Sequence, residues 1–207
     1  MLCRWCGEPV AKVLARRDRL YCSKRCRQTA FRLRRKLERQ GADGRPRRLA
    51  YADPPYPGKS FLYRDQESYG GEVDHRELLS LLKEHDGWAL STSSRALRDV
   101  LPLCPPEVHV CAWVKPIGAS SKALGMVVTW EPVIVKPARE LTPGKRDHLR
   151  AHPARGGGTL IGRKPLAFCA ALFGWLGALP GDELEDLFPG TGIVGRAWEE
   201  FQRSVAR

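Results

Sequence analysis

The feature that most constrains the fold is the alternation of short apolar segments with segments of helical pattern. Residues 108–114 are rich in β-branched and aromatic side chains, which is typical of a buried strand. This alternation predicts an α/β fold with a mostly parallel sheet covered by helices on both faces. The other expected strands cover residues 49–52, 88–92, 127–135 and 184–188, and the expected helices follow Asp74 and cover 94–101, 165–179 and 193–205.

Local signals add detail to this scheme. Asp74 with Glu77 three residues later is typical of a capped helix start, and Leu78, Leu79, Leu81 and Leu82 would form its apolar side. Pro132 inside an expected strand predicts a sheet edge or a bulge. Residues 57–71 and 136–160 are predicted to be loops because they are polar and rich in glycine. In the second loop, His148 and His152 favour phosphate contact over a metal site.

Charge is distributed unevenly along the chain. The net charge is +12, and residues 1–48 hold 16 Lys or Arg and 4 Asp or Glu, so the rest of the chain is neutral. We call the basic N-terminal segment the head and the neutral remainder of the chain the body. Such a basic segment predicts binding to nucleic-acid phosphates, which release counterions when Lys and Arg bind them. The alternative is a solvated basic helix that only aids solubility.

Four cysteines stand in the basic head. Cys3 and Cys6 form one close pair, and Cys22 and Cys26 form a second. Two such pairs can supply four thiolates to a structural Zn²⁺. The alternative, four buried packing residues, fits poorly because the head has no apolar core of its own. Three more cysteines lie in apolar surroundings and are expected to pack there: Cys104, Cys111 and Cys169.

Asp53-Pro54-Pro55-Tyr56 follows the first expected strand of the body. The carboxylate of Asp53 and the carbonyl of Pro54 could each accept a hydrogen bond from one of the two N–H groups of a nucleobase amino group. They would free its lone pair for attack, while the prolines fix the backbone. Tyr56 could stack on a base that has left the duplex. The alternative is a strand-terminating turn, since two prolines end a strand for steric reasons.

A second motif, Asp186-Leu187-Phe188-Pro189-Gly190-Thr191-Gly192, follows the last expected strand. Gly190 and Gly192 remove side chains where a nucleoside-like ligand would approach, and the next helix offers its N–H groups. The alternative is a tight turn without a ligand. Both motifs stand at the carboxyl ends of strands, where ligands gather in open parallel sheets.

These residues resemble the S-adenosylmethionine (SAM)-dependent methyltransferases that act on nucleobase amino groups. That family carries [DNS]-P-P-[YFW] as its catalytic motif and F-x-G-x-G as its cofactor motif, and Asp53 with Tyr56 resembles the adenine-specific version. The order of the motifs is similar to the permuted messenger-RNA adenosine methyltransferases and their bacterial and phage relatives. Residues 130–135 and the pair Lys164-Pro165 are also similar, and the resemblance covers about residues 48–201.

The resemblance implies a Rossmann-like methyltransferase sheet that is permuted and short at its C-terminal end. It implies N6-adenine methylation, with Asp53, Pro54, Pro55 and Tyr56 as catalytic residues. The residues that it implies for the cofactor pocket are Lys164, Pro165, Asp186, Phe188, Gly190, Thr191 and Gly192.

We therefore expect three regions: a four-cysteine, zinc-binding head at 1–40, a linker at 41–47 and a methyltransferase domain at 48–207. DNA is the favoured substrate, RNA the nearest alternative, and an inactive nucleic-acid-binding regulator a further one. Methylation of a protein glutamine is another possibility, but it usually goes with Asn at the first motif position, where this chain has Asp53. No apolar run is long enough to span a bilayer, and the polar start of the chain predicts a cytoplasmic protein. A homodimer is left open.

Overall fold

The computed structural model describes residues 21, 23–28, 31, 45–58, 60–63, 71–121, 125–141, 144–154 and 163–205. The chain forms two compact units, Met1–Arg45 and Pro46–Arg207. In the first unit, residues 24–28 are helical, and the hydroxyl oxygen of Ser23 accepts a hydrogen bond from the Cys26 N–H at 3.1 Å. Ser23 thus stands where a helix-capping residue is favoured. Most of the basic segment that follows lies outside the described residues.

The second unit is built on a six-stranded sheet in the order β5-β3-β4-β2-β1-β6. β1 is parallel to both β2 and β6, and β3 is parallel to β5. β4 runs antiparallel to β2 and to β3, so five strands share one direction and β4 opposes them. The bounds are β1 Arg48–Ala52, β2 Gly87–Ser91, β3 His109–Ser121, β4 Met126–Lys136, β5 His148–Arg150 and β6 Glu183–Asp186.

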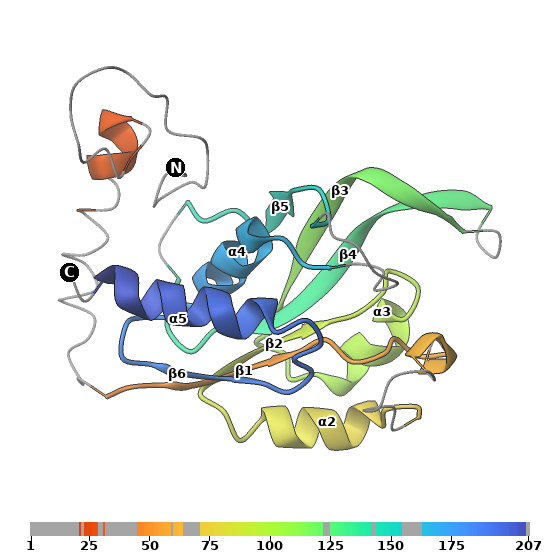
Figure 1. The fold of residues 1–207 in the computed structure, drawn as a ribbon. Helices are drawn as coiled ribbons and strands as arrows, with labels where there is room; N and C mark the ends of the chain where they lie inside the picture. The colour runs from red at the N-terminus through yellow and green to blue at the C-terminus, as the bar shows by residue number, and fades with distance from the viewer. Residues whose placement is uncertain are drawn as a thin grey trace. The chain divides into compact units, whose positions relative to one another are not determined.

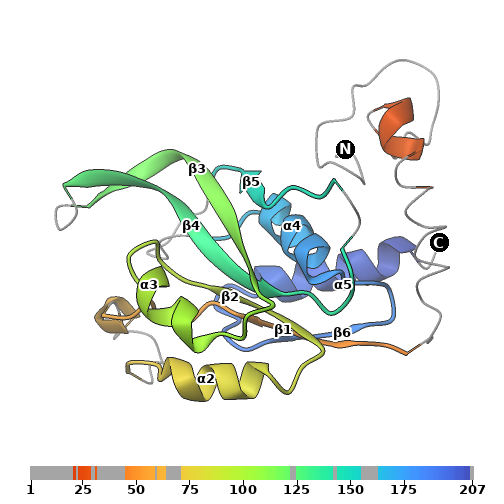
Figure 2. The same ribbon diagram turned by 180° about the vertical axis from the view of Figure 1, so that it is seen from behind.

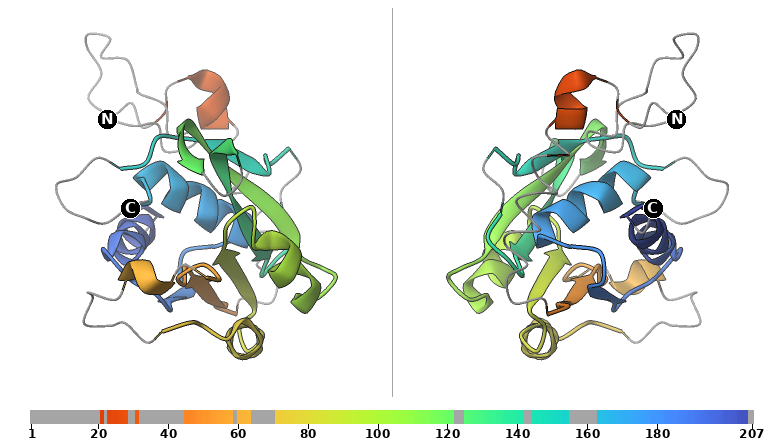
Figure 3. Two further views of the ribbon diagram at one scale, coloured as in Figure 1. Left: turned by 90° about the vertical axis from the view of Figure 1, so that its right-hand side faces the viewer. Right: turned by 90° about the vertical axis from the view of Figure 1, so that its left-hand side faces the viewer.

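Helices cover both faces of this sheet, as the alternation predicts. α4 (Leu166–Leu176) and α5 (Ile193–Val205) pack on the face that carries Tyr51 and Trp113. α2 (His75–Leu82) and α3 (Leu97–Val100) pack on the face that carries Trp88. Figures 1 and 3 show the two groups of helices on opposite sides of the strands. β1 and β2 lie in the middle and are almost wholly buried, which explains their continuous apolar sequence.

Asp74 caps α2 as expected, because its carboxylate accepts the N–H groups of Arg76 and Glu77. Leu78, Leu79 and Leu82 are buried, but Leu81 is 43% exposed, so its expected place on the apolar side is wrong. The helical period turns Leu81 away from the sheet.

Pro132 lies inside the sheet rather than at its edge, since β4 runs between β2 and β3. Ala112, which is opposite Pro132 in the register, donates its N–H to the Asp147 carbonyl oxygen at 2.8 Å. The β3–β4 ladder therefore loses no hydrogen bond through the proline. The register shift between these strands falls elsewhere, between Val114 and Ala119. Figures 1 and 2 show β3 and β4 extending together beyond the neighbouring strands.

Four other details differ from expectation. The loop predicted at 136–160 contains the short strand β5, which pairs with β3. A 3₁₀ turn, η1 (Ser60–Tyr63), interrupts the loop predicted at 57–71, and another, η2 (Leu101–Leu103), extends α3. α4 ends at Leu176 because Gly177 takes a left-handed conformation, with φ 67°, that terminates the helix.

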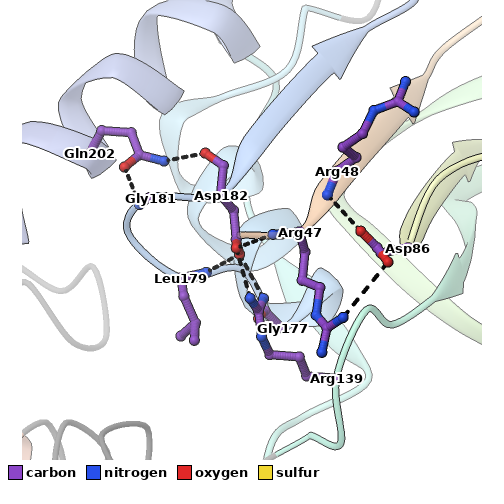
Figure 4. Close-up of polar contacts among 9 residues, drawn as sticks. All are labelled: Arg47, Arg48, Asp86, Arg139, Gly177, Leu179, Gly181, Asp182 and Gln202. Atoms are coloured by element: carbon purple, nitrogen blue, oxygen red, sulfur yellow. Dashed lines mark hydrogen bonds and ion pairs between the residues drawn. The ribbon is translucent and has the colours of Figure 1, made fainter. Parts of the chain in front are cut away.

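Asp182 fastens the amino end of β6 to its surroundings (Figure 4). Its two carboxylate oxygens accept the Arg139 guanidinium at 2.6 and 2.7 Å. They also accept the backbone N–H groups of Arg47 and Leu179 at 2.8 and 2.7 Å. The carbonyl oxygen of Asp182 accepts a further bond from Gln202. This buried carboxylate is fully partnered.

None of the helices in the described ranges is of a length and apolarity that would let it cross a membrane.

Candidate active site

The two sequence motifs meet at the edge of the sheet where β1, β2 and β6 end, which we call the carboxyl edge. β1 ends at Ala52 directly before Asp53, and β6 ends at Asp186. The two strands are parallel neighbours with Tyr51 opposite Asp186 in the register. The structure thus brings together residues that are far apart in the sequence.

A chain of opposite charges runs through this edge on the side of α4. The Lys164 Nζ donates to Asp53 Oδ1 at 3.0 Å and to Glu131 Oε2 at 3.2 Å. The other oxygen of Glu131 accepts the Lys115 ammonium. The side chains of Lys164, Glu131 and Lys115 are only 7%, 14% and 16% exposed, and that of Asp53 is 28% exposed.

Aromatic rings form the apolar floor of this chain of charges. The Lys115 Nζ lies 4.7 Å and the Lys164 Nζ 5.3 Å from the Trp113 ring centroid. Phe168, in the first turn of α4, lies 5.4 Å from the Lys164 Nζ. Ammonium groups over ring faces gain electrostatic stabilisation, which helps to offset the cost of burying them.

The neighbouring charges favour ionisation of Lys164 and Glu131, whereas burial leaves the pKa of Asp53 above its usual value. Burial raises the pKa of Asp53, the Lys164 ammonium lowers it, and the Glu131 carboxylate raises it again. Burial alone would lower the pKa of Lys164, but Asp53, Tyr51 and Glu131 raise it above its usual value. Burial likewise opposes ionisation of Glu131, yet Lys164 and Lys115 bring its pKa below the usual range. Lys164 is therefore a buried permanent cation.

Tyr51 lies beneath Asp53 on the same face. Its hydroxyl group shares a 2.9 Å hydrogen bond with the Ser91 hydroxyl. Burial and the nearby Asp53 carboxylate raise the pKa of Tyr51 well above its usual value. The phenol consequently stays neutral.

Asp186 is the one acidic residue of this edge with an unsatisfied atom in the described part of the chain. Its Oδ1 is buried and has no hydrogen-bond partner among the described residues. Burial raises its pKa to about 6, the Phe188 backbone N–H lowers it, and the Asp53 carboxylate raises it. A buried acceptor without a donor is costly, so this oxygen suits a ligand that brings an N–H donor and positive charge.

The glycine turn follows β6 and leads into α5. Gly190 and Gly192 have φ angles of +49° and +66°, and the Gly192 N–H donates to the Pro189 carbonyl oxygen at 2.7 Å. Because L side chains rarely adopt these angles, the turn geometry alone requires both glycines. A side chain at Gly190 would meet only the Phe188 carbonyl oxygen, at 3.8 Å, within the described structure. The space beside Gly190 is therefore open, whereas a side chain at Gly192 would meet the Arg196 guanidinium at 3.3 Å.

The remaining expected site residues line the same segments. Pro54 is buried, and Pro55, Tyr56, Phe188 and Thr191 are half-buried. Pro165 stands at the N-cap of α4, one position earlier than a first-turn proline, and its carbonyl oxygen accepts the Phe168 N–H at 2.9 Å. This sharp entry into the helix places Lys164 against Asp53.

Sequence reasoning missed Glu131, Lys115 and Trp113 as site residues. Trp113 and Glu131 are opposite each other in the β3–β4 register, and Lys115 follows on the same face as Trp113. A lysine two residues after a strand tryptophan, with a glutamate in the next strand, is a signal only once the register is known.

The expected zinc ligands fall mostly outside the described residues. This applies to Cys3, Cys6 and Cys22, whereas Cys26 is described and lies at the helix of the first unit. Among the described residues, no three His, Cys, Asp or Glu side chains form a group that could hold a metal ion. Burial raises the pKa values of Cys111 and Cys169 to about 12 and that of Cys104 to about 11, so these thiols are unreactive packing residues.

No protein-family model matches this chain, and no curated protein matches it. Solved structures do resemble it. The crystal structure of the M1.HpyAVI–SAM complex aligns with a TM-score of 0.52 over 84% of this chain and 85% of that chain, at 16% sequence identity. A structure of M1.HpyAVI aligns with a TM-score of 0.48 over 84% of each chain, also at 16% identity. The likeness to the complex establishes the fold. The second unit has a Rossmann-like methyltransferase fold, as the sequence predicts.

Proposed function

We propose that this protein transfers a methyl group from SAM to the N6 amino group of adenine in DNA. The observation that carries the proposal is that two acidic residues lie at the same edge of the sheet. Asp53 forms an ion pair there, and a buried oxygen of Asp186 has no hydrogen-bond partner among the described residues. The likeness of the fold to a protein solved in complex with SAM supports it.

The amino group of adenine is a poor nucleophile because its lone pair is delocalised into the ring. Asp53 Oδ1 accepts from Lys164, and we assign its other oxygen to one N–H of the substrate. The Pro54 carbonyl would accept the second N–H. Two fixed acceptors favour a tetrahedral nitrogen and stabilise the charge that develops there. Lys164 keeps Asp53 ionised and oriented for this contact.

Methyl transfer leaves the nitrogen with one proton too many. The new N–C bond would form from the lone pair of the nitrogen while the bond between the methyl carbon and the sulfur of SAM breaks, which leaves its electron pair on a neutral thioether as the leaving group. One N–H bond must then break. Asp53 is the carboxylate placed to take this proton, since burial raises its pKa above the ordinary value. Its proton can pass to water from a side chain that is 28% exposed.

The residues of the glycine turn and β6 fit SAM. When bound, SAM supplies an electrophilic methyl group on a positively charged sulfur, and its methionine part carries an ammonium group. Asp186 Oδ1 would accept from that cation, which would satisfy the buried acceptor and lower the pKa of the carboxyl. The open space beside Gly190 leaves room for the ligand to approach the backbone.

The test is to incubate the purified protein with methyl-labelled SAM and with duplex DNA, single-stranded DNA or RNA. Nucleosides from each digest are then separated to identify the methylated base. We expect N6-methyladenine in DNA. The methylation rate of Asp53→Ala should fall by at least about a thousandfold, because this change removes a hydrogen-bond acceptor for the amino group and the carboxylate that takes its proton. Asp147→Asn is the matched control, since its carboxylate is 82% exposed.

Label in RNA alone would change the substrate class but keep the chemistry. Label in no nucleic acid, with Asp53→Ala behaving as the wild type, would refute the proposal that the protein is an enzyme. The alternative of an inactive nucleic-acid-binding regulator would then remain.

We also propose that the head, residues 1–40, binds one structural Zn²⁺ through Cys3, Cys6, Cys22 and Cys26 and delivers the enzyme to nucleic acid. The spacing of the cysteines and the excess of basic residues support this. Metal analysis should find one zinc per chain in the wild type and less in Cys22→Ser. An equal zinc content in both would contradict the site.

A further inference from the structure

Glu131 is the only acidic side chain that bridges two lysines in the described structure. Its Oε2 accepts from Lys164 and its Oε1 from Lys115. At 14% exposure, with both partners nearly as buried, this carboxylate is better shielded from water than Asp53, which it does not touch. Burying charges costs free energy that is offset only where their geometry is good. A buried bridge of this kind therefore suggests a function.

The surroundings hold Glu131 in one place. Its Cα is paired with that of Trp113 across the β3–β4 ladder, and it shares a face of β4 with the buried Val133 and Val135. The Trp113 indole N–H donates to the Ala151 carbonyl oxygen at 2.9 Å, which fixes the ring below both lysines. The bridge is thus built on rigid strands.

The backbone of Lys164, unlike that of Glu131, lies outside the strands and helices. It precedes α4 in an extended segment, and a lysine side chain is long and has many rotamers. Without Glu131, only Asp53 would hold its ammonium group among the hydrogen-bond acceptors described. Two carboxylates at 3.0 and 3.2 Å restrict it to a position from which it orients Asp53.

We propose that Glu131 is a positioning residue of the methyl transfer, which fixes Lys164 against Asp53 and is itself fixed by Lys115. The inference rests on the proposed function for its effect on rate. The arrangement that it describes can be tested without any turnover.

Glu131 affects Asp53 in two opposite ways. Its negative charge raises the pKa of Asp53, whereas the Lys164 ammonium that it holds in place lowers this pKa. Asp53 is also surrounded by Lys115, Tyr51 and Asp186, which the variants below leave unchanged.

Two substitutions separate position from charge. Glu131→Asp keeps the charge but shortens the side chain, so that it no longer reaches both lysines. Glu131→Gln keeps the length but loses the charge. A positioning role predicts that Glu131→Asp raises the pKa of Asp53, because Lys164 is released while the negative charge stays. In Glu131→Gln the lost charge lowers this pKa and offsets the release of Lys164, so its midpoint should lie below that of Glu131→Asp. A role through charge alone predicts no change for Glu131→Asp and a lower pKa for Glu131→Gln.

The measurement is a pH titration of the Asp53 side-chain carboxyl by carbon-13 NMR in the full-length protein, assigned with Asp53→Asn. We expect the Asp53 midpoint to rise in Glu131→Asp and kcat to fall about tenfold to a hundredfold in both variants, as for other small misplacements of reacting groups. Glu140→Gln, which changes an exposed glutamate outside the site, should leave both values unchanged.

An unchanged or lowered midpoint in Glu131→Asp would overturn the proposal. Should Glu131→Gln fail to fold, Glu131→Asp alone decides. A wild type that transfers no methyl group would refute the proposed function, while the NMR titration would still answer whether Glu131 positions Lys164.

Discussion

Asp182 and Asp186 stand at the two ends of β6, and they differ in how their carboxylates are partnered. Asp182 is 5% exposed and accepts four hydrogen bonds from Arg139, Arg47 and Leu179. Asp186 accepts from the Phe188 N–H but keeps one buried oxygen without a partner among the described residues. Buried polar groups in folded proteins are nearly always satisfied, so this oxygen supports the proposal that the carboxyl end of β6 meets a ligand.

The same contrast holds for the two charge clusters around these residues. The cluster at Asp182 ties loops and strand starts together through backbone groups (Figure 4). The cluster at the carboxyl edge joins side chains to side chains, from Lys115 through Glu131 and Lys164 to Asp53. The first cluster stabilises the fold, and under the proposed function the second would set the charge and position of groups that face the substrate.

Asp182→Asn should give the largest effect on stability. The change leaves the buried Arg139 guanidinium without its carboxylate, which costs about 3–5 kcal/mol. The Tm of the protein should then fall by roughly 6–20 °C. Thermal unfolding followed by circular dichroism measures this, with the exposed neighbour Glu183→Gln as control. An unchanged Tm would refute the structural role of the cluster.

Asp186→Asn should weaken SAM binding without lowering the stability of the protein. Without SAM, its unfolding free energy should be no lower than that of the wild type, because no charged partner is lost and the buried carboxyl becomes an uncharged amide. SAM affinity should fall about tenfold to a hundredfold, the value of one hydrogen bond between charged groups. Calorimetric titration with SAM measures this fall. Equal affinities for both proteins would show that Asp186 is not the acceptor for the ligand.

The pH dependence of SAM binding should report the same carboxyl. The pKa of Asp186 is about 6, and only the ionised form can hold a cation. Affinity should thus fall about tenfold between pH 8 and pH 5, where about a tenth of the carboxyl stays ionised. The difference between wild type and Asp186→Asn isolates this contribution. A wild-type profile as flat as that of the variant would contradict it.

Stability without SAM should show the opposite trend for this residue. The folded protein keeps the Asp186 proton up to about pH 6, whereas the unfolded chain releases it near pH 4. Since the folded state binds more protons in this window, the contribution of Asp186 to stability falls as the pH rises through it. Asp186→Asn should lack that slope.

Much of the fold and half of the site follow from the sequence alone. Alternating apolar segments and the Asp74 cap predict the strands and helices, and parallel strands place Asp53 and Asp186 at one edge. The sequence could not predict Glu131 and Lys115, because their meeting depends on the register of an antiparallel pair. Likewise β5, three residues long in a polar segment, forms only because β3 offers it a partner.

Gln202→Ala should give the smallest effect. At the Asp182 end, Gln202 accepts from the Gly181 N–H and donates to the Asp182 carbonyl oxygen, both at 2.9 Å. The loss of these neutral bonds should cost about 1 kcal/mol, or roughly 2–4 °C in Tm, and leave SAM affinity unchanged. Thermal unfolding and SAM titration of the same samples measure both. A variant that weakened SAM binding while leaving Tm intact would mean that the two ends of β6 are coupled, and that the division between a stabilising end and a ligand end is wrong.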